Sequence, residues 1–490
     1  MKPPTRISVA LLLACAAAMR LSASDQVSVI PFTLKTFDGA EHSAELVTLR
    51  VPENRRRPTG KTIDLGFLRL RHTGAEAGTV IIFLPPGPGI PGSTLGRVPP
   101  FFRLFDRLRE FGDVVLLDIR GEGMSSPNLD ECSVSPEVSP HALESWKSLV
   151  QQFASSVYAC ADYWRKRGVD LSAYNNEEIA DDIDDLRLSL RYRHVSLVGF
   201  SAGTDLGIEV LRRHGTTVER AVFAATGAEE LRPILPSTYD LQLQKIAALY
   251  PGDQPSEDLV RLFDNDVKAL DASPVTLQLV ASKDKPPGAV KIGSIAFKAV
   301  VTEILNGSIG ALRPLLTSVR DHDYSLFQIY VQKMMTGFTG SMTLVGRTID
   351  CSAAMPSDRV ARVEAEAKTS RLGNYRNIHL QPAVCRAALG EVPRYSRPEP
   401  LFSTTPTLFI SGGLDANTPP ADAETLRWGF VNATHVVIRN GFHDTLPSPD
   451  VQRLILDFFK GDDVIGRTIK FDLPRSLPLE EAILAAQRSR

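Results

Sequence analysis

The sequence has almost no excess charge of either sign. Its 55 lysines and arginines nearly balance 57 aspartates and glutamates, which gives a formal net charge of -2. This balance provides no electrostatic reason to expect a nucleic acid or an anionic membrane surface as a partner. The one basic run, Arg55 to Arg57, lies between prolines in turn-like sequence. We interpret this run as a solvated loop.

Cysteine is scarce, with five residues and no Cys-x-x-Cys motif, which argues against a cysteine-based metal site. Cys15 lies near the N-terminus, and the other four allow three disulfide pairings. We favour the pairs that are local in sequence, Cys132 with Cys160 and Cys351 with Cys385. Four buried free thiols are the alternative if the chain is not exported.

Long apolar runs are also missing, except near the N-terminus. Lys2 and Arg6 precede a mostly apolar run over residues 7–19, and small residues follow it. This pattern predicts a cleavable secretory signal over residues 1–24, because the run is too short for a convincing transmembrane helix. Residues 12–15 also resemble a bacterial lipobox, in which Cys15 would be lipidated. We therefore expect a secreted or periplasmic protein, with a membrane-anchored lipoprotein as the alternative.

The chain has no internal repeat and no low-complexity tract, and its 490 residues suggest two modules. A β-rich leader over residues 26–71 precedes two apolar runs, 79–84 and 114–118, with a helix-like segment between them. Strand, helix and strand in this order predict a parallel sheet. The alternation fades into amphipathic segments between residues 233 and 397 and then resumes. We expect an α/β core over residues 25–232 and 398–490, interrupted by a helical cap insertion over 233–397.

The most informative stretch is Gly199-Phe200-Ser201-Ala202-Gly203, which follows an apolar β-like run and precedes a helix-compatible segment. Strand, Gly-x-Ser-x-Gly and helix are the layout of a nucleophile elbow, in which small residues allow a strained turn that exposes the serine. Gly-x-Ser-x-Gly alone would be consistent with chance. Its position between a strand and a helix favours Ser201 as a nucleophile.

A serine nucleophile needs a base, usually histidine, and an acid that orients this base. Asp415 and His443 each follow a predicted strand near the C-terminus, at residues 407–410 and 434–438. An aspartate in a polar turn and a histidine on a surface loop are the ordinary alternatives. Because both residues follow strands and come after the serine in the chain, we predict a Ser201, Asp415 and His443 triad.

The oxyanion hole would combine the backbone N–H of Ala202 with one donor from the loop over residues 85–92. Proline has no N–H, so Gly87 is the leading candidate in this loop and Gly89 the second. We expect no metal, because adjacent residues such as those of the Asp321-His322-Asp323 stretch cannot all reach one ion from regular structure. We also expect no cofactor.

Several stretches together resemble the α/β-hydrolase superfamily, and within it the secreted tripeptidyl-aminopeptidase and prolyl-aminopeptidase group of serine peptidases. They are Val51-Pro52, Gly87-Pro88-Gly89, the segment from Asp118 to Ser125, residues 168–172, the Ser201 elbow, the Asp415 turn with Thr418-Pro419, and Gly441-Phe442-His443. The resemblance covers nearly all of the chain after the signal. It implies an exported serine hydrolase whose triad is Ser201, Asp415 and His443.

The sequence differs from this group at two positions. Pro86 replaces a glycine before Gly87, which removes an N–H donor and stiffens the loop. Ala202 stands where an aromatic residue is common, which predicts a wider acyl pocket. An aminopeptidase must also bind a free α-amine, for which Glu229 and Glu230 are the carboxylates best placed by sequence. Surface charge is the ordinary interpretation of such a pair.

These observations favour an aminopeptidase that releases residues or short peptides from free N-termini through an acyl-enzyme. A carboxylesterase on the same scaffold is the alternative, so the expected substrate is a peptide or a small ester. A non-catalytic binding protein with this fold is a third hypothesis. The intact set of triad candidates argues against it.

Overall fold

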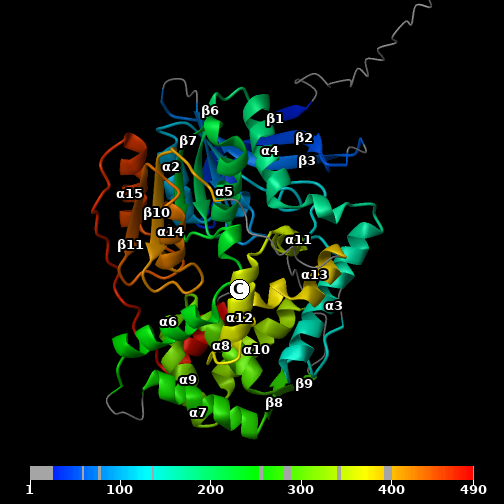
Figure 1. Cartoon of the computed structure of the whole chain (residues 1–490), viewed down its shortest axis with the longest axis vertical. Helices are drawn as coiled ribbons and strands as arrows, with labels where there is room; N and C mark the ends of the chain where they lie inside the picture. The colour runs from blue at the N-terminus through cyan, green and yellow to red at the C-terminus, as the bar shows by residue number, and fades with distance from the viewer. Residues whose placement is uncertain are drawn as a thin grey trace, which may run out of the picture.

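The structure, a computed structural model of the chain, describes residues 26–57, 60–74, 79–134, 137–252, 258–280, 288–338, 344–390 and 400–488. The predicted secretory signal and Cys15 lie outside these residues. Figure 1 shows a sheet with flanking helices in the upper part of the view and a mainly helical part below it.

The main sheet has the strand order β1-β2-β3-β5-β4-β6-β7-β10-β11 within the described residues. The first four strands in this order pair antiparallel, and β5, β4, β6, β7, β10 and β11 pair parallel. The central strands are continuous apolar runs because helices cover both of their faces. The bounds are β1 Val27–Lys35, β2 Glu41–Pro52, β3 Thr62–Leu70, β4 Thr79–Leu84, β5 Asp113–Leu116, β6 His194–Phe200, β7 Val218–Ala224, β10 Thr407–Gly412 and β11 Ala433–Ile438.

Each face of this sheet packs against its own set of helices. One core contains α2 (Pro99–Leu108) and α15 (Pro449–Lys460), and the other contains α4 (Asn176–Ser189), α5 (Ala202–His214) and α14 (Pro420–Arg427). The short helix α1 (Gly92–Leu95) follows the loop after β4. The predicted fold class is therefore confirmed: an α/β protein with a mainly parallel sheet.

Most of the helical insertion packs around a separate hydrophobic core, whereas its helices at residues 344–352 and 382–389 pack into one core of the sheet domain. Its elements are α6 Pro236–Leu249, α7 Leu259–Ala272, the hairpin β8 Val275–Leu279 with β9 Gly288–Ile292, α8 Ser294–Leu305, α9 Leu312–Arg320, α10 Ser325–Gly337, α11 Leu344–Ser352, α12 Ser357–Ala367, the 3-10 helix η7 Tyr375–Leu380 and α13 Pro382–Leu389. Helical insertions are thus present where the fading alternation predicted them.

Two helices outside residues 233–397 also pack with the insertion. Helix α3 (Trp146–Arg165) contacts α13, and the last helix, α16 (Leu479–Arg488), contacts α9 and α10. In Figure 1 the red end of the chain lies among the green helices of the lower part. Ala482 and Ala486 of α16 are buried in the core of the insertion. The C-terminal helix therefore contributes to the cap, whereas the sequence suggested that it belongs to the sheet domain.

Both predicted disulfides are present, which confirms the sequence-local pairing. Cys132 pairs with Cys160 of α3, and Cys351 of α11 pairs with Cys385 of α13, with Cα atoms 5.6 and 5.2 Å apart. Each bond joins a helix to another segment of the cap side of the molecule. Among the described helices, none combines the length and the apolar character that crossing a membrane requires.

The basic run at Arg55 is not simply a solvated loop, and this interpretation is corrected by the structure. The Arg55 guanidinium is half-buried and lies 2.6–2.8 Å from carboxylates of Glu178, Asp182 and Asp185 on α4. The Asn175 side chain caps this helix by accepting from the N–H of Glu178. The three carboxylates lie on successive turns of α4 and bind the loop that contains Arg55. The contact between this loop and α4 forms only in the folded chain.

Candidate active site

Ser201 occupies the turn between β6 and α5, near the middle of the sheet. Its φ of 53° and ψ of -120° are strained for a residue with a side chain. The turn needs its flanking glycines, since a Cβ on Gly199 would lie 2.9 Å from the Gly203 oxygen. A Cβ on Gly203 would lie 2.1 Å from the backbone oxygen of Leu84. The local sequence thus fits the elbow expected around Ser201.

The structure brings Asp415 and His443 to this serine. Both follow parallel strands, β10 and β11, whose carboxyl ends lie at the same edge of the sheet as the end of β6. The Nε2 atom of His443 lies 2.9 Å from Ser201 Oγ, and its Nδ1 atom lies 2.8 Å from Asp415 Oδ2. These distances form a continuous chain of hydrogen-bonding groups from carboxylate to hydroxyl.

The Asp415 carboxylate is almost completely buried and well supplied with donors. The backbone N–H groups of Asn417 and Thr418 donate to Oδ1 at 2.8 and 3.1 Å, and the Thr418 hydroxyl donates to Oδ2 at 2.6 Å. These bonds orient the carboxylate towards His443. With Asp415 Oδ2 as the acceptor for Nδ1–H of His443, we assign Nε2 as the ring nitrogen that is free to accept a proton.

The loop after β4 separates the two glycines that the sequence left as oxyanion candidates. Gly87 has a φ of +124° and lines the cavity that contains Ser201 and Ala202. Gly89 has a φ of +103° and lines a smaller cavity on the other side of the loop. The structure therefore places Gly87, rather than Gly89, on the side of the loop where a substrate would meet Ser201.

The cavity at Ser201 has a volume of about 280 Å³ and lies between the sheet domain and the cap. Its wall combines apolar side chains such as Leu231 and Ile378 with an unusual number of charged ones. The main charged side chains are Asp205, Arg232, Glu303, Arg347, Asp350 and Arg376. A polar or charged substrate suits such a wall better than a purely apolar one does.

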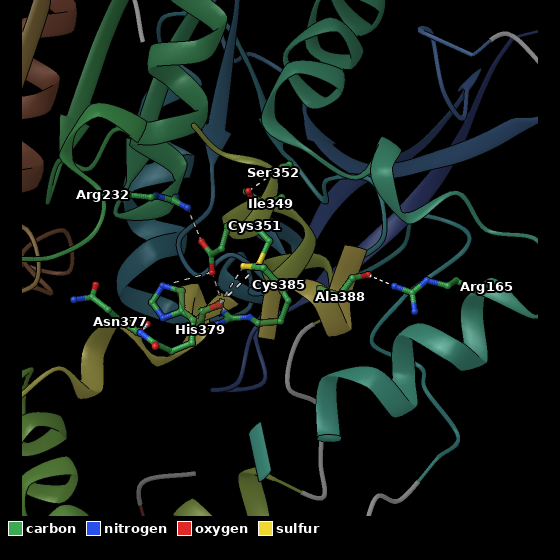
Figure 2. The surroundings of a disulfide bond; sticks show 12 residues. Arg165, Arg232, Ile349, Cys351, Ser352, Asn377, His379, Cys385 and Ala388 are labelled. Carbon is green, nitrogen blue, oxygen red and sulfur yellow. Dashed lines mark hydrogen bonds and ion pairs between the residues drawn. A yellow bond between two sulfur atoms is a disulfide. The ribbon is translucent and has the colours of Figure 1, made fainter. Parts of the chain in front are cut away.

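The charged residues form a connected cluster around Arg232, and Figure 2 shows Arg232 and His379 beside the second disulfide. Arg232 binds Asp205 of α5 and lies 2.5 Å from Asp350 of α11. Asp350 also lies 3.3 Å from Arg347 and 3.7 Å from His379. The cluster therefore connects the elbow helix to two elements of the cap.

Burial changes the titration of this cluster. Burial, aided by the cations of Arg347 and Arg376, lowers the pKa of His379 to about 3, so this histidine is neutral near pH 7. Burial also raises the pKa of Asp205, although Arg232 opposes the rise. For Asp350, burial raises the pKa. The nearby His379, Arg347 and Arg232 together lower it by more, so the pKa of Asp350 falls below its usual value.

The Cys351–Cys385 disulfide supports this wall. Cys351 follows Asp350 in α11, and both sulfur atoms lie within 3.9 Å of the carbonyl oxygen of His379. In Figure 2 His379, Cys351 and Cys385 lie together below Arg232. The bond therefore joins α11 to α13 beside η7, and α11 and η7 both line the cavity.

Glu229 and Glu230, the predicted amine-binding pair, are engaged away from this cavity. Glu230 lies 3.3 Å from Arg212, and Glu229 accepts from the N–H of Ala354 at 3.4 Å. Sequence reasoning did not identify the charged cap residues that do line the cavity, since they come from separate helices with no shared local motif. Within the described ranges, no group of three or more His, Cys, Asp or Glu side chains could hold a metal ion.

A family profile described as the alpha/beta hydrolase fold matches residues 79–272. A search of curated protein sequences finds no match. The chain therefore has the α/β-hydrolase fold.

Solved structures of this fold are similar to the chain at low sequence identity. A proline iminopeptidase from Mycobacterium smegmatis is 13% identical, with a TM-score of 0.38 and coverage of 84% of this chain and 98% of that chain. A thermophilic esterase from Thermogutta terrifontis is 14% identical, with a TM-score of 0.36 and the same coverage. An esterase from Exiguobacterium antarcticum is 13% identical, with a TM-score of 0.34 and coverage of 88% and 100%.

Proposed function

We propose that the protein is a serine hydrolase that acts through an acyl-enzyme, with Ser201 as nucleophile, His443 as base and Asp415 as its orienting acid. The observation that carries this proposal is the uninterrupted series of short contacts from Asp415 through His443 to Ser201, at the edge of a cavity. The backbone N–H groups of Ala202 and Gly87 are the proposed oxyanion hole.

In the proposed reaction, His443 Nε2 takes the proton from Ser201 Oγ while this oxygen attacks the substrate carbonyl. The resulting imidazolium is stabilised by Asp415, and the carbonyl oxygen becomes an oxyanion. When the tetrahedral intermediate collapses, His443 gives its proton to the leaving amine or alcohol, and the acyl group stays on Ser201. Water then gives a proton to His443 and attacks the ester carbonyl. When this second tetrahedral intermediate collapses, His443 returns the proton to Ser201 Oγ and the acid leaves.

Among hydrolases of this type, an aminopeptidase fits the cavity best. Its volume of about 280 Å³ is at the small end for ligand sites, and residues of the cap form part of its wall, which favours a substrate that inserts a chain end. A free α-amine needs a carboxylate partner. Glu303 of α8 lines the cavity, its side chain is 44% exposed, and its contact with Arg376 is a single one of 3.3 Å. We propose Glu303 for this role in place of Glu229 and Glu230.

The test compares matched chromogenic amides with free and acetylated N-termini, and a short acyl ester, using wild type and Ser201→Ala. An aminopeptidase prefers the free amine, and Ser201→Ala abolishes the turnover. Glu303→Gln should reduce the preference for the free amine. Glu230→Gln is the matched control and should leave it unchanged. Equal turnover of free and acetylated amides would refute the aminopeptidase assignment.

A carboxylesterase remains the second candidate because Ala202 lines the cavity with only a methyl group. A small residue after the nucleophile leaves room for a broad acyl group. Turnover of the ester without cleavage of any amide would establish this alternative. If no substrate were turned over in a Ser201-dependent way, the chain would instead be a binding protein with this fold.

We also propose that the protein is exported. Two disulfides with partners 28 and 34 residues apart in the chain are typical of an oxidising compartment. Secretion or periplasmic location predicts that thiol titration of the native protein, without reductant, finds none of these four cysteines free. Labelling with a radioactive fatty acid would test the lipid anchor at Cys15.

A further inference from the structure

A buried carboxyl group lies behind the proposed oxyanion loop and has no assigned role. Glu122, in the turn after β5, has no solvent exposure. In the part of the chain that the structure describes, no donor reaches hydrogen-bond geometry with either of its carboxyl oxygens. An unsatisfied carboxyl group at such a depth is costly unless it has a partner or a purpose.

The carboxyl group of Glu122 lies beside a cavity of about 20 Å³ that also touches the oxyanion loop. Pro85, Pro86, Pro88 and Gly89 form one side of this cavity, and Asn176 forms part of another. The Nδ2 atom of Asn176 is buried and likewise has no partner among the described residues. A cavity of roughly 10–15 Å³ or more with two to four polar partners is large enough for one buried water.

The loop itself lacks donors, because three of its five residues from Pro85 to Gly89 are prolines. Only Gly87 and Gly89 have an N–H, and Gly87 faces the reaction cavity. The loop therefore presents more carbonyl oxygens than it can satisfy from its own backbone. A neutral carboxylic acid, together with a water, supplies donors where an ionised carboxylate supplies none.

We propose that Glu122 is a positioning residue for the oxyanion loop, which it holds from behind as a neutral acid together with Asn176 and one buried water. It does not touch the substrate. By holding the Gly89 side of the loop, it keeps the Gly87 N–H directed at the oxyanion. This inference rests on the proposed serine-hydrolase function.

The charges around Glu122 agree with a neutral carboxyl group. Burial raises its pKa well above the usual value, and the negative charges of Asp118 and Asp130 raise it further. The backbone amides of Ile119 and Gly89 face the carboxyl group and lower the pKa less. Arg232, which also lines the cavity, is already bound to Asp205 and Asp350.

An ionised Glu122 would oppose catalysis. The same small cavity touches Ala202 and Gly203 at the first turn of α5, where the proposed oxyanion donor Ala202 lies. A negative charge there would repel the oxyanion, which forms on the other side of this backbone. The neutral form is therefore the productive one, and activity should fall when Glu122 loses its proton.

The first test measures kcat and KM for the best substrate with wild type, Glu122→Leu and Glu122→Gln. We expect Glu122→Leu to lower kcat by about 10- to 100-fold, the size of effect that a loop misplaced by about 1 Å can cause. KM should change little, because the side chain does not contact the substrate. Glu122→Gln should stay close to wild type, since a neutral amide also donates and accepts. Glu131→Gln, an exposed glutamate nearby, is the matched control.

The pH profile separates this role from simple packing. Wild type should lose kcat at alkaline pH as Glu122 ionises, and Glu122→Gln should lack this loss. A Glu122→Leu variant with unchanged kcat, or identical alkaline limbs for wild type and Glu122→Gln, would overturn the inference.

Two readouts do not need turnover. Difference infrared spectroscopy between wild type and Glu122→Gln at neutral pH should show the carbonyl band of one protonated carboxyl group. A crystal structure should show an ordered water between Glu122 and Asn176. If Ser201-dependent turnover is never found, the proposed function fails while these readouts still test the position and protonation of Glu122. An ionised carboxyl group or a dry cavity would refute the inference directly.

Discussion

Replacing Asp415 with asparagine is the sharpest test of the proposed catalytic triad, because the substitution removes one negative charge and changes the side-chain volume very little. The amide oxygen can still accept from the N–H groups of Asn417 and Thr418, as Oδ1 of Asp415 does now. The amide nitrogen would then face Nδ1 of His443, where Oδ2 now lies at 2.8 Å. A donor at this place favours the tautomer with hydrogen on Nε2, which cannot accept the proton of Ser201.

The expected loss follows from two effects. Charge centres about 4 Å apart interact by about 4 kcal/mol at an effective dielectric constant of about 20, which estimates the lost stabilisation of the imidazolium. The unfavourable tautomer adds about 1 kcal/mol or more. Together they correspond to a fall in kcat of about 10⁴-fold, at 1.36 kcal/mol per tenfold change.

The assay is kcat at saturating substrate, with thermal unfolding as a check that Asp415→Asn is folded. Asp444→Asn is the matched control, since Asp444 is an exposed carboxylate next to His443 in the chain. This control should lose less than about tenfold in kcat. If Asp415→Asn kept more than a tenth of the wild-type kcat while folded, the proposed role of Asp415 would be refuted.

Three further changes have defined outcomes. Gly203→Ala should lower kcat by about 100-fold and destabilise the fold by about 1–3 kcal/mol, because its Cβ would lie 2.1 Å from the Leu84 oxygen. Arg232→Met should lower the free energy of unfolding by about 3–5 kcal/mol in urea titrations, since it leaves the buried Asp205 without its cation and removes one of two cations beside Asp350. Asp266→Asn should stabilise the protein at pH 8 by about 1–4 kcal/mol but hardly at pH 4, because burial raises the pKa of Asp266 to about 7.

The sign of the last effect follows from proton release. Between pH 4 and 7 the unfolded chain ionises at position 266 while the folded chain keeps its proton, so wild-type stability falls over this window. Equal pH dependence of the stability of wild type and Asp266→Asn would contradict the raised pKa of Asp266.

For Arg232, the control is Arg453→Met, which breaks an exposed pair with Asp450 and should cost less than about 1 kcal/mol. If Arg232→Met also cost less than about 1 kcal/mol, the stabilising role assigned to the buried Arg232 would be contradicted. Normal kcat in Gly203→Ala would mean that the elbow tolerates the added methyl group.

Much of the site could be predicted because its signals are local. An apolar strand followed by Gly-x-Ser-x-Gly needs only neighbouring residues to specify the turn at Ser201. Asp415 and His443 each follow a strand, and parallel strands end at one edge of a sheet. Their approach to Ser201 therefore followed from strand order without any knowledge of side-chain positions. Their catalytic roles remain the proposal that the kinetic tests address.

The wall of the cavity could not be predicted in this way. The charged wall residues come from separate elements of the chain: Arg347 and Asp350 from α11, and Arg376 from η7. No regular sequence spacing relates these elements, so their contact in space could not be predicted from the sequence. Glu229 and Glu230 follow β7 closely, yet a turn directs them to Arg212 and Ala354 instead of the cavity. Amphipathic patterns identify which face of a helix is buried, but not which partner covers it.

The sequence by itself determined the α/β class and predicted the elbow, the order of the triad candidates and the favoured disulfide pairs, since each depends on periodicity, neighbouring residues or short separations along the chain. Only the tertiary structure decided that α16 packs into the cap, that Gly87 and not Gly89 faces Ser201, and that Glu122 lies behind the oxyanion loop. The physical reason is that packing between distant segments depends on the summed shape and charge of surfaces that exist only in the folded chain.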